Sequence, residues 1–228
     1  MFNQTTDRFR TFGRAKGKPL SSAQAKLMRD VFPRFDVADK VAEGQSPFTN
    51  MPGMHWLEIG FGGAEHLLWQ AETHPDVTLL GVEPFLNGVA KAVKGISDKE
   101  LTNIRLHRGD ARDVLAVLPD NTLERVFVLF PDPWPKVRHH KRRIINETFI
   151  AELHRVIKPG GKFRFASDII HYVDWTLMRM KAHGGFDWPA KQQADWRERP
   201  EDWPSTRYLE KALREGRSGH FFEFIKNN

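Results

Sequence analysis

The feature that most constrains the fold is a regular alternation of short apolar runs and longer amphipathic stretches that begins at residue 55. Apolar, β-branched runs that stop at glycine, proline or an acid are typical of buried strands. We predict strands over residues 55–60, 77–84, 104–111, 123–130 and 161–168. We predict helices over residues 64–72, 87–96, 144–157 and 170–183. Strands that alternate with helices favour an open, parallel α/β sheet with helices on both faces.

The two ends of the chain differ from this repeating part. Residues 21–35 are predicted to form a helix, and Gly44 to Gly53 form a linker by composition. Residues 186–192 and 220–226 are predicted as late strands. We therefore divide the chain into a basic arm and helix over residues 1–50 and a main domain over residues 51–228.

Composition excludes several classes of protein. The 228 residues include no cysteine, which excludes disulfide scaffolds, thiolate metal sites and cysteine nucleophiles. The histidines His66, His107, His171 and His220 lack the spacing of metal ligands, so no metal is expected. Neither a secretory signal nor an apolar stretch of roughly 20 residues is visible, so we expect a cytoplasmic protein without a membrane span.

Positive charge is concentrated in two places. Lysine and arginine number 35 against 29 acids, a net charge of +6. The first segment contains Arg8, Arg10, Arg14, Lys16 and Lys18. The second, residues 136–143, reads KVRHHKRR and contains no acid. Such runs are often only solvated surface, but two of them favour a surface that binds the phosphates of a nucleic acid.

Acidic residues and glycines lie at the ends of three successive predicted strands, where the ligands of parallel sheets bind. Glu58, Gly60 and Gly62 lie at the end of the first strand, and the glycines allow a tight turn and close approach of a ligand. Glu83 can accept hydrogen bonds from ribose hydroxyls, and Asp110 can accept one from an adenine amino group. Taken singly, Glu83 could be an acid at a helix start and Asp110 a turn residue.

Together these residues describe an adenosine pocket without a phosphate site. The dinucleotide pattern G-x-G-x-x-G would place its third glycine at residue 65, which is Glu65. A carboxylate there would repel a pyrophosphate, and this disfavours an NAD-dependent reductase. S-adenosylmethionine fits the pocket, because carboxylates such as Glu58 would attract its amino group and its sulfonium.

The fourth strand is followed by the sequence PDPWPK, residues 131–136. Three prolines stiffen this loop and present Asp132 beside the cofactor pocket. Trp134 offers a flat face on which a base could stack, although a rigid turn with a packing tryptophan is the alternative. After the fifth strand, Asp168 could either cap the next helix or face the substrate.

These motifs, with LEIGFGGAEHL, GVEPF, GDARDVL, LFPDPWPK–HHKRR, FASD and TRYLEKALREGR, resemble those of the tRNA (guanine-N7-)-methyltransferase family over about residues 55–220. The resemblance implies a seven-stranded, Rossmann-like class I sheet whose last strand is antiparallel. It implies methyl transfer from S-adenosylmethionine to N7 of guanine 46 in the variable loop of tRNA. Asp132 would be catalytic. The cofactor would contact Glu58, Gly60, Gly62, Glu83, Asp110 and Asp132. The substrate would contact Lys136, Asp168, Thr206, Arg207, Tyr208 and Leu209. We further predict that tRNA phosphates are held by Arg138, Lys141, Arg142 and Arg143.

Two positions depart from the family pattern. Ala64 stands where the family often has a glycine, and Leu209 stands where an acid is common, with Glu210 next to it. Two other functions stay open from the sequence: a methyltransferase that acts on another RNA site, and a non-catalytic RNA-binding protein with a methyltransferase fold. The oligomeric state also stays open.

Overall fold

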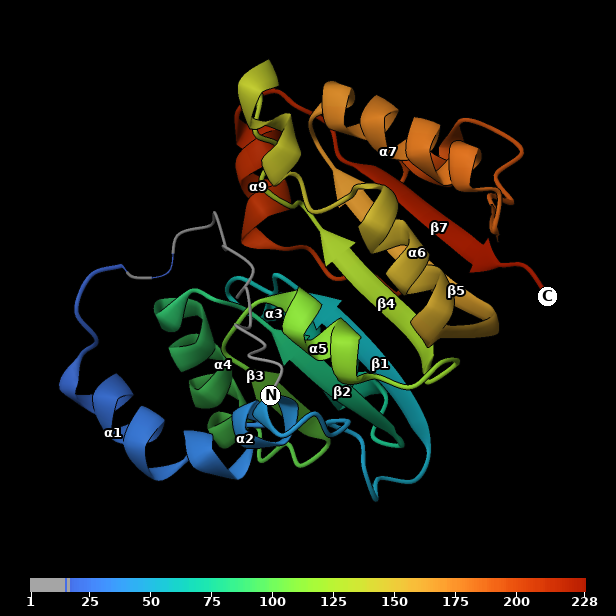
Figure 1. The fold of residues 1–228 in the computed structure, drawn as a ribbon. Coiled ribbons are helices and arrows are strands. Elements are labelled where there is room, and N and C mark those ends of the chain that lie inside the picture. The colour runs from blue at the N-terminus through green and yellow to red at the C-terminus, as the bar shows by residue number, and fades with distance from the viewer. Residues whose placement is uncertain (1–14, 16) are drawn as a thin grey trace.

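Seven strands form one sheet in the computed structural model, which describes residue 15 and residues 17–228 (Figure 1). The strands are β1 Met54–Ile59, β2 Val77–Val82, β3 Ile104–His107, β4 Leu123–Leu129, β5 Ile157–Ser167, β6 Phe186–Asp187 and β7 His220–Lys226. Their order across the sheet is β3-β2-β1-β4-β5-β7-β6. Strands β1 to β5 pair in parallel, and β7 is antiparallel to both β5 and β6. The predicted fold class is therefore confirmed.

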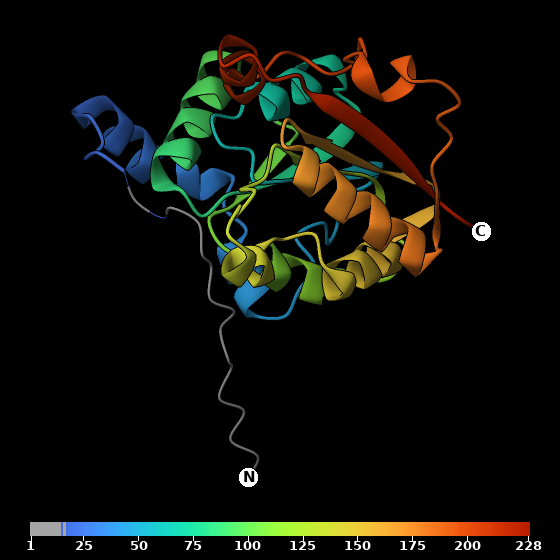
Figure 2. The same ribbon diagram turned by 90° about the horizontal axis from the view of Figure 1, so that it is seen from above.

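Helices cover both faces of the sheet (Figure 2). The α-helices are α1 Ser22–Asp30, α2 Ala38–Ala42, α3 Glu65–Thr73, α4 Leu86–Asp98, α5 Ala111–Val117, α6 Glu147–Val156, α7 Ile170–His183, α8 Ala194–Arg197 and α9 Arg207–Arg214. The 3₁₀ helices are η1 Phe32–Arg34 and η2 Val137–Arg142. Apolar side chains of α5, α6 and α7 pack on one face, and those of α3 and α4 pack on the other.

The central strands are apolar on both sides because each face is covered. In β1, Leu57 and Ile59 belong to the core beneath α5 to α7, whereas Trp56 belongs to the core beneath α3 and α4. In β4, Val126 and Phe127 divide between the two cores in the same way. The unbroken apolar runs of the sequence thus correspond to strands that are buried on both faces.

Several predicted boundaries need correction. The helix predicted over residues 21–35 ends at Asp30, because Pro33 restricts the residue before it, and a 3₁₀ turn follows. The strand predicted over residues 186–192 is limited to Phe186–Asp187, since Pro189 lacks the N–H that a further ladder bond needs. The predicted third strand stops at His107, and the sequence analysis missed the helix α5 that follows it.

The helix predicted from residue 87 begins one residue earlier, and the side chain of Asn87, which could have capped it, binds elsewhere. The helix begins at Leu86, with Phe85 as its N-cap and no side-chain cap. Asn87 instead accepts a hydrogen bond from the Gly17 N–H at 3.0 Å and donates one to the Lys18 carbonyl at 2.8 Å. This side chain therefore ties the start of the described chain to α4.

The described residues before β1 pack onto the sheet and its helices. Leu106 of β3 donates a backbone hydrogen bond to Phe35 and accepts one from Val37. Leu27 and Met28 of α1 pack against the core that α4 covers. The predicted basic residues Arg8, Arg10, Arg14 and Lys16 lie outside the described residues, whereas Lys18 lies within them. Among the described residues, no helix is both long and apolar enough to cross a membrane.

Candidate active site

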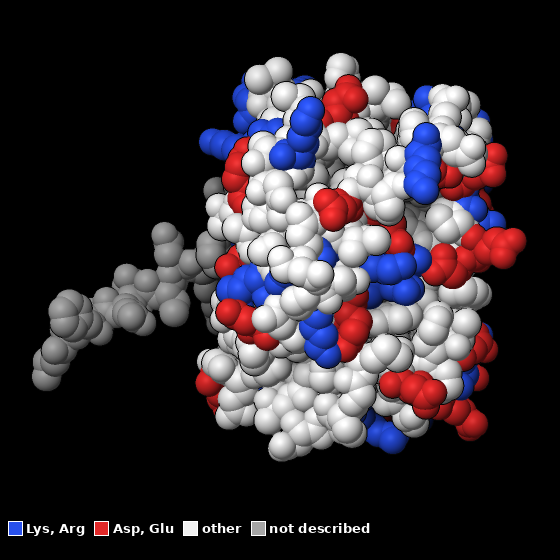
Figure 3. All heavy atoms as spheres, turned by 90° about the vertical axis from the view of Figure 1, so that its right-hand side faces the viewer, with Lys and Arg blue, Asp and Glu red and all other residues white. Residues whose placement is uncertain are grey.

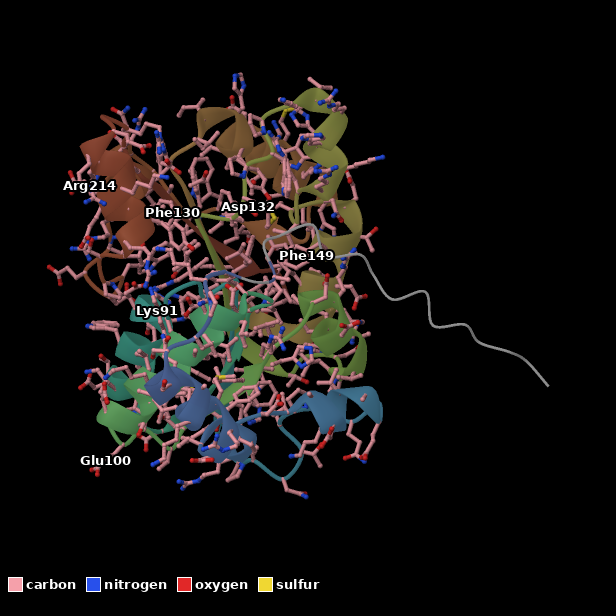
Figure 4. All side chains as sticks on the ribbon, turned by 90° about the vertical axis from the view of Figure 1, so that its left-hand side faces the viewer. Lys91, Glu100, Phe130, Asp132, Phe149 and Arg214 are labelled. Carbon is pink, nitrogen blue, oxygen red and sulfur yellow. The ribbon has the colours of Figure 1, made fainter. Side chains whose placement is uncertain are left out.

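The order of the strands indicates where a ligand would bind. The chain runs outward from β1 through β2 to β3, and then crosses back to β4 on the other side of β1. In open α/β sheets, ligands bind at such a reversal, outside the carboxyl ends of the strands. In Figure 4, Phe130 and Asp132 lie side by side in the upper half of the molecule, with Arg214 of α9 to their left and Lys91 of α4 below Phe130. The predicted site residues are gathered around this reversal.

Glu58 in β1 is buried and has a histidine partner. Only 3% of Glu58 is exposed, and its Oε2 lies 2.7 Å from Nδ1 of His66 in the first turns of α3. His66 is also buried, and its ring meets Phe127 edge to face at a centroid distance of 4.6 Å. The sequence analysis considered His66 only as a metal ligand and assigned it no role. The one signal for its role is its place on the helix that follows the acid-bearing strand.

The turn after β1 is built around the carboxylate of Glu83. Gly60 and Gly62 have φ values of 75° and 55°, in the region that favours glycine. Ala64, which follows them, shares this conformation with a φ of 68° and is the N-cap of α3. The Gly62 N–H donates to Glu83 at 2.8 Å, and the Phe85 N–H donates to the second carboxylate oxygen at 2.9 Å.

The surroundings of Glu83 shift the pKa of its carboxyl. Burial raises this pKa, although the two backbone hydrogen bonds act in the opposite direction. The negative charges of Asp132 and Glu58 raise the pKa of Glu83 further. The site is therefore an acidic pocket that favours a cationic ligand.

Asp110 occupies the predicted strand end but already has partners there. It is the N-cap of α5, where its side chain accepts from the Arg112 N–H at 2.9 Å. The Arg112 guanidinium also donates to both oxygens of Asp110, at 2.9 and 2.7 Å. Asp110 thus serves as a helix cap in this structure, whereas the simpler interpretation of the sequence was a turn residue.

The loop after β4 contains two residues with unusual backbone conformations. Phe130 and Trp134 have φ values of 50° and 43°, which cost of order 1–3 kcal/mol each for residues other than glycine. Between them, Asp132 is exposed to solvent, and partial desolvation by the surrounding loop raises the pKa of its carboxyl. Such strain at a ligand site fits a loop whose shape serves its function.

The basic sequence after this loop forms η2 on the surface. Lys136, Arg138 and Lys141 are exposed, and Arg142 lies over the Trp134 ring at 4.9 Å. This run contains no acid, whereas the face shown in Figure 3 carries lysine and arginine interspersed with acids. The exposed members of this run are in position to meet phosphates.

Arg143 differs from its neighbours, and its place does not fit the prediction that it holds a phosphate. It is only 2% exposed, and its Nε donates to the Pro133 carbonyl at 2.8 Å. Its guanidinium lies over the rings of Tyr172 and Trp175, 4.9 and 4.8 Å from their centroids. Arg143 therefore joins the Asp132 loop to α7, a role that its place in a basic sequence does not reveal.

The predicted substrate segment, residues 206–209, lies against the glycine turn. Arg207 of α9 pairs with Glu65, with 2.6 Å between Arg207 Nε and the carboxylate. The Tyr208 ring lies so close to Gly62 that a Cβ there would come within 2.7 Å of it. The ion pair between Arg207 and Glu65 offsets the negative charge of Glu65. This charge is therefore weaker evidence against a pyrophosphate ligand than the sequence suggested.

Three other residues predicted to bind substrate have structural partners. Thr206 is the N-cap of α9 and accepts from the Leu209 N–H at 3.3 Å. The Leu209 side chain is 6% exposed and packs with Trp203 and Phe221, so it does not fit the predicted substrate contact. Asp168 caps no helix, since the N-cap of α7 is Ile169, and it pairs with Arg217 at 2.7 Å.

Comparison with known proteins identifies the family. A family model described as "Putative methyltransferase" matches residues 53–221. A tRNA (guanine-N(7)-)-methyltransferase of Agrobacterium fabrum is 44% identical over 94% of each chain. One of Roseobacter denitrificans is 42% identical over 99% of this chain and 100% of its own. The chain belongs to the tRNA (guanine-N(7)-)-methyltransferase family.

The fold agrees with this family of enzymes. A solved antibiotic-related methyltransferase superposes with a TM-score of 0.51 at 16% identity, over 92% of this chain and 97% of that one. Family membership removes the NAD-dependent reductase as an alternative. No group of three or more histidine, aspartate or glutamate side chains that could hold a metal ion occurs within the described part of the chain.

Proposed function

We propose that this protein transfers the methyl group of S-adenosylmethionine to N7 of a guanine in tRNA, at position 46 of the variable loop. The observation that carries the proposal is the position of Asp132. It follows β4, which pairs with β1 at the strand reversal, and its loop leads directly into the basic η2. Its negative charge is one of those that raise the pKa of Glu83 after β2. The names of the relatives supply the substrate and the atom. The proposal also places the protein in the cytoplasm, where tRNA is found.

The residues at the strand ends fit S-adenosylmethionine. The buried carboxylate of Glu83 suits ribose hydroxyls, and the pocket of Glu58, Glu83 and Asp132 suits a ligand with an amino group and a sulfonium. A Cβ at Gly60 would meet nothing within 4 Å, so the backbone is open to a ligand there. When bound, the cofactor supplies a methyl group on a good leaving group.

Binding of the cofactor requires a movement of Tyr208. Glu58, Gly60, Phe130, Thr206 and Tyr208 line a cavity of only about 10 Å³ in this structure. The Tyr208 ring lies against Gly62, which is one of the positions proposed to contact the cofactor. A nucleoside that approaches the Gly62 backbone therefore displaces this side chain.

The chemistry needs alignment more than acid–base catalysis. Guanine N7 has a free lone pair, so no base has to create the nucleophile. A positioned substrate turns the reaction into an effectively unimolecular step. The guanine gains positive charge as N7 is methylated, and the carboxylate of Asp132 stabilises that charge or orients the guanine through its N1 and N2 donors.

The direct test is methyl transfer from labelled S-adenosylmethionine to unmodified tRNA, followed by mapping of the modified base. We expect N7-methylguanine in the variable loop. Label at another base would retain the cofactor and refute the proposed target. Cofactor binding without transfer to tRNA would point to another substrate, and absence of both would favour a non-catalytic RNA-binding protein.

We expect Glu83→Gln to raise the Kd of S-adenosylmethionine by about 10- to 100-fold, the change in affinity that loss of a hydrogen bond to a charged group usually causes. The variant removes the charge that accepts ribose hydroxyls and turns an amide NH₂ toward a backbone donor, Gly62 or Phe85. Isothermal calorimetry measures the change. Glu72→Gln, an exposed acid of α3, is the control that should leave the Kd unaltered. Unchanged affinity in Glu83→Gln would remove Glu83 from the cofactor site.

A second prediction concerns the exposed basic residues Lys136, Arg138 and Lys141. We expect their joint replacement by alanine to weaken tRNA binding and to reduce the slope of log K against log salt concentration by about two to three. Each phosphate that loses its cation no longer releases counterions on binding. Filter binding from 50 to 300 mM salt, roughly the range over which such effects are large, measures the slope. An unaltered slope would show that tRNA phosphates lie elsewhere.

A further inference from the structure

We propose that His66 is a positioning residue that holds Glu58 for the cofactor and links it to the chain segment before the substrate motif. The inference rests on the proposed function, because it assumes that Glu58 contacts S-adenosylmethionine. The sequence motifs of the site do not assign any role to His66. The structure provides the argument in three hydrogen bonds that connect β1, α3 and the segment around Asp202.

The first bond fixes the carboxylate of Glu58. Nδ1 of His66 donates to Oε2 of Glu58 at 2.7 Å, and both side chains are shielded, with relative exposures of 2% and 4%. The bond uses one of the two carboxylate oxygens, and Glu58 also lines the cavity at the strand ends. The Phe127 ring, edge to face with the imidazole, limits its rotation. A buried carboxylate without such a donor is costly and free to turn away.

The second bond fixes the tautomer of the imidazole. Nε2 of His66 lies 3.1 Å from the side-chain nitrogen of Gln70, one helical turn further along α3. The same amide nitrogen donates its other hydrogen to the Asp202 carbonyl at 2.9 Å. An amide turned the other way would place its oxygen against that carbonyl oxygen, so the NH₂ group must face both partners. Nε2 therefore accepts, and the proton is on Nδ1, where it points at Glu58.

The third bond ends on an anchored part of the chain. The Asp202 carboxylate accepts from Arg164 of β5 at 2.7 Å and lies 3.6 Å from Arg125 of β4. Arg164 in turn donates to Glu223 of β7 at 2.7 Å. The Asp202 carbonyl is thus a fixed acceptor, four residues before Thr206 and the proposed substrate segment. The orientation of Glu58 and the position of this segment depend on the same buried bonds.

Variants of His66 that differ in one hydrogen bond test the inference. His66→Leu removes both bonds, and we expect the Kd of S-adenosylmethionine to rise by about 10- to 100-fold. His66→Asn places an amide NH₂ near the position of Nδ1, and we expect it to recover most of the affinity. Gln70→Leu removes the neutral bond to His66 Nε2 and the bond to the Asp202 carbonyl but leaves the His66–Glu58 bond, with an expected loss of about 3- to 10-fold. His74→Leu, at the end of the same helix, is the control and should bind as the wild type does.

The outcomes separate this inference from the proposed function. If the wild-type protein neither binds the cofactor nor methylates tRNA, the proposed function fails and the inference falls with it. If the wild type does both and His66→Leu binds the cofactor equally well, the inference alone is overturned. Where His66→Leu does not fold, His66→Asn is compared with His66→Gln, whose longer amide reaches the Nε2 position instead. Stronger binding by His66→Asn supports the inference, and equal binding by the two refutes it.

Discussion

We expect Asp132→Asn to lower kcat for tRNA methylation by about 10²- to 10³-fold, the effect of removing one preorganised electrostatic contact to a developing charge. Asparagine keeps the size and polarity of the side chain, so the strained loop between Phe130 and Trp134 should hold its shape. The charge that would stabilise the methylated guanine is lost. Because this contact matters most in the transition state, kcat should fall far more than the affinity for S-adenosylmethionine.

The pH dependence of the reaction gives a second test of the same residue. Burial raises the pKa of Asp132, and only the ionised form can stabilise positive charge on the guanine. In the wild type, kcat should therefore fall on acidification at a higher pH than an ordinary aspartate would require. That acidic limb should be absent from Asp132→Asn. Asp174→Asn, on the exposed side of α7, is the matched control. Wild-type activity in Asp132→Asn would refute the proposed role.

The sequence predicts well those elements whose limits are set locally. The helix Ile170–His183 and the strand His220–Lys226 coincide with the predicted residues, and a glycine marks one end of each: Gly184 follows the helix and Gly219 precedes the strand. The acids Glu58, Glu83 and Asp132 lie at or just after the carboxyl ends of the adjacent strands β1, β2 and β4, and parallel strands share one carboxyl edge. Their partners in the hydrogen-bond network depend on distant segments, and sequence spacing carries no information about those contacts.

The predictions that failed share one physical cause. Each of these side chains has several possible partners, and the tertiary packing determines which of them it contacts. Asn87 has the side chain of a cap, yet it bonds Gly17 and Lys18, some 70 residues away. His66 becomes significant only because β1 and α3 fold against each other. Leu209 looked out of place in a site motif, but it completes a small apolar cluster with Trp203. The roles of these polar and apolar residues therefore depend on tertiary contacts that the sequence does not show.

Within the basic run of residues 136–143, Arg143 is the residue whose structural role is most clearly distinct from a role in binding nucleic acid. We expect Arg143→Ala to lower the free energy of unfolding by about 2–4 kcal/mol, because it removes a buried cation–π contact and leaves the Pro133 carbonyl without its donor. Arg143→Lys should recover only part of this stability, since an ammonium cannot both cover the aromatic rings and reach that carbonyl. Urea denaturation measures both variants.

The matched variant is Arg138→Ala, because Arg138 is exposed on the same run. We expect Arg138→Ala to change stability by less than about 0.5 kcal/mol and to weaken tRNA binding instead. Arg143→Ala should show the reverse, with unfolding at a lower urea concentration and an unaltered salt slope for tRNA binding. Its kcat should also be lower, because the Asp132 loop loses its anchor on α7. A salt slope that falls in Arg143→Ala while its stability stays at the wild-type value would show that this arginine leaves its buried site to hold a phosphate.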